Sequence, residues 1–283
     1  MRWRGREGSS NIDDRRRMSG GKKATGIGGI IMTAVIAYIM SGGDMGAVLN
    51  SVISETISSS AQTREYKPTK KDEEHAAFVS VILKDTEDVW QEIFTQNSLR
   101  YKKPTLVMFR GTTTSGCGEA HSQMGPFYCP SDQKVYIDLG FFDELQYKFK
   151  AKGDFAQAYV IAHEIGHHVQ NLFGILPKVH KKQKYMNKID SNKLSVKTEL
   201  QADCFAGVWA KKIDHKKQLL DRGDIEEALN AASRIGDDTL QRQAGGEVVP
   251  DSFTHGSASQ RKEWFYRGYN SGNINSCNTF SSL

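Results

Sequence analysis

The chain has 283 residues, of which 38% are hydrophobic and 25% are charged, and this composition excludes a disordered protein. Its formal net charge is +5. Residues 1–43 hold eight basic and three acidic residues, which leaves 30 of the 38 basic and 30 of the 33 acidic residues in the rest of the chain. This balance excludes a nucleic-acid-binding surface built on net positive charge.

The N-terminal region is expected to cross a membrane. Residues 1–23 are basic and are expected to form a disordered cytosolic tail, and residues 24–43 contain no charged residue. About 20 apolar residues suffice for a helix to span a bilayer, so the sequence predicts a single transmembrane helix there, with the N-terminus inside and the remainder outside. A buried core helix and a cleaved signal peptide are the alternatives, but no A-x-A cleavage site follows Met40.

The folded domain is expected at 72–283, after a Ser/Thr-rich linker at 44–71. Alternation of β-branched residues predicts strands at 104–110 and 134–139, separated by a loop, and Val135–Leu139 is a candidate edge strand. Apolar periodicity and capping residues predict helices at 72–94, 141–149, 195–212, 224–235 and 257–269, and one beginning near Asp154. The expected fold class is α+β: a mostly helical domain with a small β-sheet.

The four cysteines all follow the predicted membrane segment, and none has C-x-x-C spacing. An even number without zinc-ribbon spacing favours two disulfides in an oxidising compartment. We expect Cys117 to pair with Cys129 across a Gly/Pro-containing loop, and Cys204 to pair with Cys277 near the C-terminus. Free thiols are the alternative.

The segment "YVIAHEIGHHVQNLFG" (159–174) contains the pattern H-E-x-x-H at His163, Glu164 and His167. Residues four apart on a helix share a face, so both imidazoles can bind one Zn²⁺ ion. Glu164 then lies beside the metal, where it can hold and deprotonate a water molecule. His168 lies off the ligand face and is expected to be a bystander.

A third ligand is expected from "KTELQADCFAGVWA" (197–210), because the metzincin pattern is excluded by Gln170 and Phe173. Glu199 and Asp203 are four residues apart on a face that continues with small residues, which would let this helix lie close to the H-E-x-x-H helix. Glu199 is the predicted ligand and Asp203 the predicted partner of a ligating histidine. The reverse assignment of these two acids is the alternative.

His255, in "DSFTHGSASQR" (251–261), precedes a helix for which Ser257 is the predicted N-cap. It is a candidate donor to the oxyanion of the tetrahedral intermediate in a hydrolytic reaction. An ordinary loop or capping role is the other reading.

These motifs, together with "SGCGEA", "GPFYCPSDQKVYIDL" and the leader "MRWRGREGSSNIDDRR", resemble the bacterial neutral zinc metallopeptidase family over nearly the whole chain. The resemblance implies a membrane-anchored, zincin-like protein with His163 and His167 as zinc ligands and Glu164 as catalytic acid/base. The spacing of Glu199 and Asp203 also resembles that of thermolysin-type enzymes.

The sequence therefore predicts a zinc endopeptidase, anchored in the cytoplasmic membrane of a bacterium, that cleaves peptides or proteins in the periplasm or outside the cell. The alternative is a non-catalytic envelope protein whose zinc site is structural or binds a partner. A closed site with four protein ligands would favour that alternative.

Overall fold

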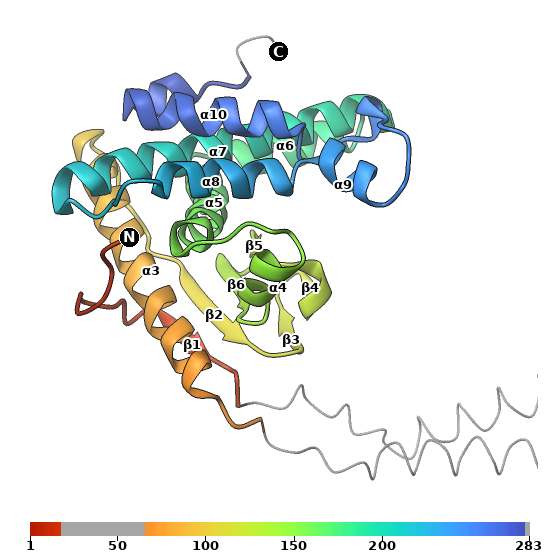
Figure 1. Ribbon diagram of the computed structural model, residues 1–283. Coiled ribbons are helices and arrows are strands. Elements are labelled where there is room, and N and C mark those ends of the chain that lie inside the picture. The colour runs from red at the N-terminus through yellow and green to blue at the C-terminus, as the bar shows by residue number, and fades with distance from the viewer. Residues whose placement is uncertain (18–65, 281–283) are drawn as a thin grey trace, which may run out of the picture. The chain divides into compact units, whose positions relative to one another are not determined.

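The computed structural model describes residues 1–17 and 66–280, which form the predicted mostly helical α+β fold (Figure 1). Its sheets have four strands and two strands. The strands are β1 Ile12–Asp14, β2 Thr105–Phe109, β3 Thr112–Ser115, β4 Gly118–His121, β5 Phe127–Cys129 and β6 Lys134–Asp138. The helices are α3 Lys70–Gln96, α4 Phe141–Tyr147, α5 Asp154–Leu172, α6 Ile175–Gln183, α7 Lys188–Lys217, α8 Asp224–Arg234, α9 Asp237–Gln243 and α10 Ala258–Ser271.

The larger sheet has the strand order β1-β2-β6-β5. β1 and β6 run parallel to β2, whereas β5 pairs antiparallel with β6 through Cys129 and Lys134. The expectation that Val135–Leu139 is an edge strand is therefore wrong, because β6 has a neighbour on each side and is buried from Val135 to Asp138. The edge strands are β1 and β5, and β5 lies in the stretch expected to be a loop.

Helix α5 lies between the sheet and a layer of helices (Figure 1). It contacts β5 and β6 on one side and α7 and α8 on the other, and α10 packs along α7. A helix covered from both sides must be apolar around most of its circumference, which explains the long hydrophobic run of the 159–174 segment. The H-E-x-x-H residues thus lie on a helix that is packed from two sides.

Helices α7 and α10 approach so closely that glycine is required on both. A Cβ atom on Gly207 would overlap the carbonyl oxygen of Phe265, and one on Gly268 would overlap that of Cys204.

We predict that Gly207→Ala lowers the free energy of unfolding by about 1–3 kcal/mol or more, because the helices must move apart. Urea unfolding measures this loss. Gly246→Ala is the control, since the atom nearest to a Cβ added at Gly246 would be 3.6 Å away. Equal stability of the two variants would contradict the close packing.

Both predicted disulfides are present. Cys117 bonds to Cys129 at the end of β5, and Cys204 of α7 bonds to Cys277. No free cysteine is found in the described residues, so the free-thiol alternative does not hold there. Two disulfides are typical of proteins that fold in an oxidising environment.

The N-terminal residues, expected to be a disordered tail, are instead ordered against the domain. Trp3 is 8% exposed and packs edge-on against Phe78 of α3. Ser9 donates a hydrogen bond of 2.7 Å to the buried carboxylate of Glu87, and β1 then adds a parallel edge strand to β2. A single buried tryptophan followed by a three-residue strand leaves no periodicity that the sequence alone would reveal.

Truncating Trp3 tests whether this segment contributes to the fold. We predict that Trp3→Ala lowers the free energy of unfolding by roughly 3–5 kcal/mol, the usual loss for a buried aromatic side chain. Glu7→Ala in the same segment is the matched control, because Glu7 is exposed and its loss should be nearly neutral. A Trp3→Ala variant as stable as the control would show that the segment does not stabilise the domain.

The predicted N-terminal transmembrane helix is the part of the fold prediction that is wrong. Residues 24–43 lie outside the described residues, and no helix within 1–17 or 66–280 has the length and apolar character needed to cross a membrane. Met1–Arg15 and Pro68–Leu283 belong to one unit.

Candidate metal centre

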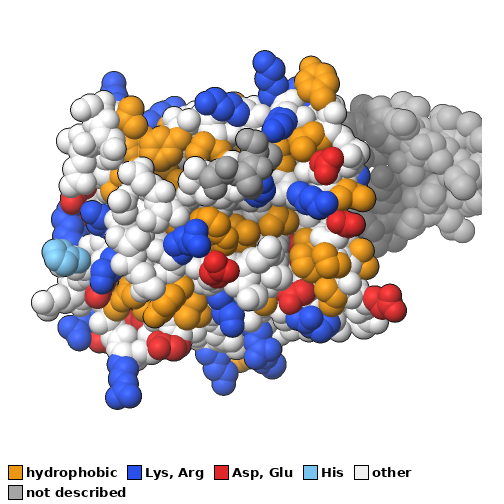
Figure 2. Space-filling view, turned by 90° about the horizontal axis from the view of Figure 1, so that it is seen from above, with side chains coloured by type: hydrophobic (Ala, Val, Ile, Leu, Met, Phe, Trp, Pro, Cys, Tyr) orange, Lys and Arg blue, Asp and Glu red, His pale blue; other side chains and the backbone are white. Residues whose placement is uncertain are grey.

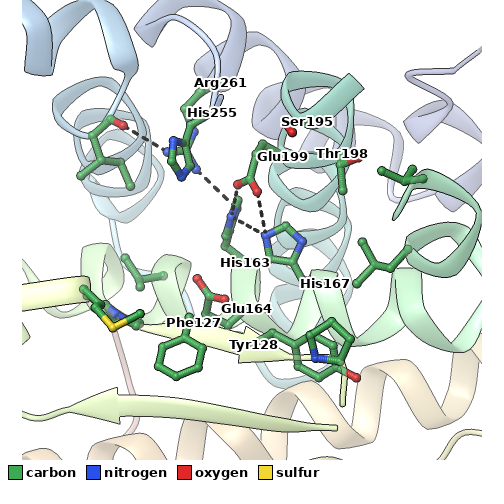
Figure 3. A pocket seen from close by; sticks show the side chains of 18 of the residues that line it. Phe127, Tyr128, His163, Glu164, His167, Ser195, Thr198, Glu199, His255 and Arg261 are labelled. Atoms are coloured by element: carbon green, nitrogen blue, oxygen red, sulfur yellow. Dashed lines mark hydrogen bonds and ion pairs between the residues drawn. The ribbon is translucent and has the colours of Figure 1, made fainter. Parts of the chain in front are cut away.

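Three of the predicted site residues bring their donor atoms together (Figure 3). The Nε2 atoms of His163 and His167 are 3.2 Å apart, and Glu199 places one oxygen 3.1 Å from the first and the other 3.4 Å from the second. Donor atoms bound tetrahedrally to Zn²⁺ at its usual bond lengths are about 3.3 Å apart. The donor set and its spacing therefore fit zinc.

Small residues allow Glu199 to reach the histidines. An added Cβ atom on Gly166 of α5 would lie 3.0 Å from the carbonyl oxygen of Ala202 on α7, so the two helices are nearly in backbone contact. Alanine at position 166 would crowd Ala202. This agrees with the expectation that small side chains on the 197–210 helix permit a close approach.

Asp203 contacts the far side of the His163 ring. Its carboxylate accepts a hydrogen bond from Nδ1 of His163 at 2.8 Å and one from the hydroxyl of Tyr159 at 2.5 Å. With Nδ1 engaged, Nε2 faces Glu199 and His167. This position suits the predicted supporting role of Asp203 better than the alternative in which it is the ligand.

Arg261 is a site residue that the sequence did not reveal. It is 2% exposed and donates to both oxygens of Asp203, at 2.8 and 3.0 Å, and to Tyr159. It also contacts the backbone carbonyl of Ile235. Its partner Asp203 is 58 residues away in the sequence, and no local pattern marks such a pairing.

The electrostatics of the site favour a cation at its centre. Burial opposes a charged His163, but contacts with Asp203 and Glu199 outweigh it and raise the pKa of His163 to about 10. Burial likewise opposes a charged Glu199, yet His167 and His163 hold the pKa of its carboxyl well below the usual range. Both shifts show that the carboxylates of Asp203 and Glu199 favour positive charge beside them, which a bound cation would supply.

Glu164 lies beside the three donors on the side of β5, facing a cavity of about 500 Å³ (Figure 3). Burial raises the pKa of its carboxyl, which suits a group that must accept and then return a proton. The cavity is open to solvent, and its apolar wall is formed by Phe127, Val160, Leu176, Val179, Ile235 and Leu240.

His255 lines the same cavity from the segment that precedes α10. Asp237 accepts hydrogen bonds from the backbone N–H of His255 at 2.6 Å and of Thr254 at 2.7 Å, and one of its oxygens lies 3.3 Å from the Nδ1 atom of His255. The contact with Asp237 raises the pKa of His255 and favours the imidazolium. Ser257 caps α10, as predicted, so His255 is free of that task.

His168 lies outside the donor set and contacts the edge strand β5. It is fully buried, and its ring nitrogens lie 3.1 Å from the hydroxyl of Tyr128 on β5 and 2.7 Å from the carbonyl of Lys102. Burial lowers its pKa to about 4, so it is a neutral imidazole. Asn171 donates to the same Tyr128 hydroxyl, and together these contacts fix β5 against α5.

Comparison with known proteins agrees with this geometry. The family described as "Putative neutral zinc metallopeptidase" matches residues 1–280. The uncharacterized protein YpfJ of Escherichia coli K12 is 50% identical over 289 residues, covering 99% of each chain. The uncharacterized protein Rv2575 of Mycobacterium tuberculosis H37Rv is 46% identical over 193 residues, covering 64% of each chain. No solved structure matches the chain. The chain therefore belongs to the neutral zinc metallopeptidase family, whose cofactor is Zn²⁺.

Proposed function

We propose that the protein is a zinc endopeptidase that cleaves polypeptides outside the cytoplasm. The observation that carries this proposal is the convergence of His163, His167 and Glu199 beside Glu164 in an open cavity. Among the described residues, no further His, Cys, Asp or Glu completes this donor set. Three protein ligands with a remaining position toward a cleft are typical of a catalytic zinc site, whereas a structural site has four.

When bound, zinc would polarise the substrate carbonyl and lower the pKa of a bound water molecule to about 7. Glu164 accepts a proton from the attacking water and then delivers it to the leaving amine. Its carboxyl suits this role because burial raises its pKa and because it lines the open cavity. His255, held by Asp237, donates a hydrogen bond to the oxyanion that develops on the substrate. Asp203 keeps His163 in the orientation that leaves Nε2 available.

The substrate in this proposal is an extended polypeptide. β5 uses one edge to pair with β6, and its residues Phe127 and Tyr128 line the cavity. An extended chain can pair with the other edge of such a strand, while apolar side chains fill the apolar wall. The two disulfides support a location in an oxidising compartment, such as a periplasm.

A peptide-library assay tests the proposal. The purified full chain, loaded with zinc, should cleave internal bonds next to apolar residues, as identified by mass spectrometry. A zinc chelator should abolish cleavage and added Zn²⁺ should restore it. A zinc-loaded chain that cleaves no member of the library would contradict the proposal.

A further inference from the structure

The corner between α6 and α7 is strongly basic. Residues 175–197 contain seven lysines and only one acidic residue, Asp190. Lys193 pairs with Asp251 at 3.7 Å, between two exposed side chains. The lysines of and just after α6 are exposed and have no ion pair within the described part of the chain; they are Lys178, Lys181, Lys182 and Lys184. Several cations thus point to solvent from this helix and from the turn that follows it. We call residues 175–189 the basic corner.

The basic corner also exposes large apolar side chains. Tyr185, two residues after the end of α6, is 84% exposed, and Ile189 in the first turn of α7 is 44% exposed. Figure 2, which looks onto the side of the molecule where α7 and α10 lie, shows lysine and arginine side chains next to exposed hydrophobic ones. Exposed tyrosine among lysines is the composition of segments that lie in the head-group region of a bilayer.

A separate apolar cavity of about 250 Å³ opens beside the same helix. Its lining is Ile175, Lys178, Val179, Lys182, Leu194 and Phe280. The two lysines carry their ammonium groups on apolar stems that form part of the wall. An apolar space next to two cations suits the chain and the head group of an anionic amphiphile.

We propose that the basic corner docks on the surface of an anionic phospholipid bilayer, with the lysines at the head groups and Tyr185 and Ile189 in the interface. An acidic protein would be attracted by the same charge, but it would not account for the apolar cavity between the lysines. The proposal does not depend on catalysis. Because His180 and Gln183 on another face of α6 line the metal-site cavity, docking would hold that cavity near the bilayer.

Vesicle co-sedimentation with the full chain tests the proposal. Vesicles of equimolar phosphatidylglycerol and phosphatidylcholine should bind more tightly than phosphatidylcholine vesicles. Replacing Lys178, Lys181, Lys182 and Lys184 by glutamine should lower this anionic preference by about 600-fold, since each lysine near an anionic surface strengthens binding about fivefold. The control replaces four exposed lysines elsewhere by glutamine and should retain the preference; these are Lys148, Lys150, Lys152 and Lys262.

A second variant separates a bilayer from a polyanion. The double variant Tyr185→Ser and Ile189→Ser keeps every lysine, and it should weaken binding to anionic vesicles about tenfold while binding to poly-glutamate is unchanged. Three results would overturn the proposal: equal binding to both kinds of vesicle, an anionic preference unaffected by the lysine substitutions, or binding to poly-glutamate as tight as to anionic vesicles. Circular dichroism of each variant confirms that it is folded.

Discussion

Replacing Glu164 by glutamine is expected to lower kcat/KM for peptide hydrolysis by roughly 10²–10⁴-fold while zinc stays bound. The amide has nearly the same size and can still hold a water molecule, but it cannot accept a proton. Because Glu164 lies beside the three donors and is not one of them, the metal content should not change. Cleavage of a fluorogenic peptide and the zinc content of the same sample give the two readouts.

The matched control for this variant is Glu144→Gln. Glu144 lies on α4 outside the metal-site cavity and pairs with Lys148 at the surface. Its substitution removes the same carboxylate charge from the chain and should leave hydrolysis unchanged. A Glu164→Gln variant with the activity of this control would show that another group takes the proton, and the proposed mechanism would be wrong.

Asp203→Asn is expected to lower the free energy of unfolding of the metal-free protein by about 3–5 kcal/mol. The substitution leaves the guanidinium of Arg261 buried without a carboxylate partner, and burial of an unpaired charge is costly. Burial opposes the charged form of Asp203, but Arg261 and His163 hold the pKa of this carboxyl at about 2, so the pair is charged at neutral pH. Urea unfolding in the presence of a chelator measures the loss.

Tyr159→Phe is the control in the same cluster, since it removes the hydroxyl that donates to Asp203 and accepts from Arg261 but leaves the charges paired. It should cost only about 1 kcal/mol. If Asp203→Asn is no more destabilising than Tyr159→Phe, the ion pair with Arg261 does not matter for stability.

Much of the metal centre could be predicted because its signals are local. The two histidines and Glu164 lie about one turn apart on a helix. Glu199 and Asp203 share a second helix, on which small residues indicate close packing. Helical periodicity links residues four apart without any knowledge of the fold. Their roles as ligands, catalyst and support stay predictions until metal binding and activity are measured.

The missed features depend on partners far away in the sequence. β5 has only three residues, and it is a strand because β6 lies beside it. Arg261 gives no local signal for its contact with Asp203. The N-terminal segment has one buried tryptophan and one short strand, and its basic composition suggested a solvated tail.

The zinc content of the purified full chain tests the central claim most directly. Elemental analysis should find one zinc ion per chain in the wild type, and Glu199→Ala should lower the zinc affinity by orders of magnitude because it removes one of three ligands. Asp251→Ala, which removes an exposed carboxylate outside the site, should leave the zinc content unchanged. A wild-type chain that binds no zinc, or a Glu199→Ala variant that binds it as tightly, would contradict the account.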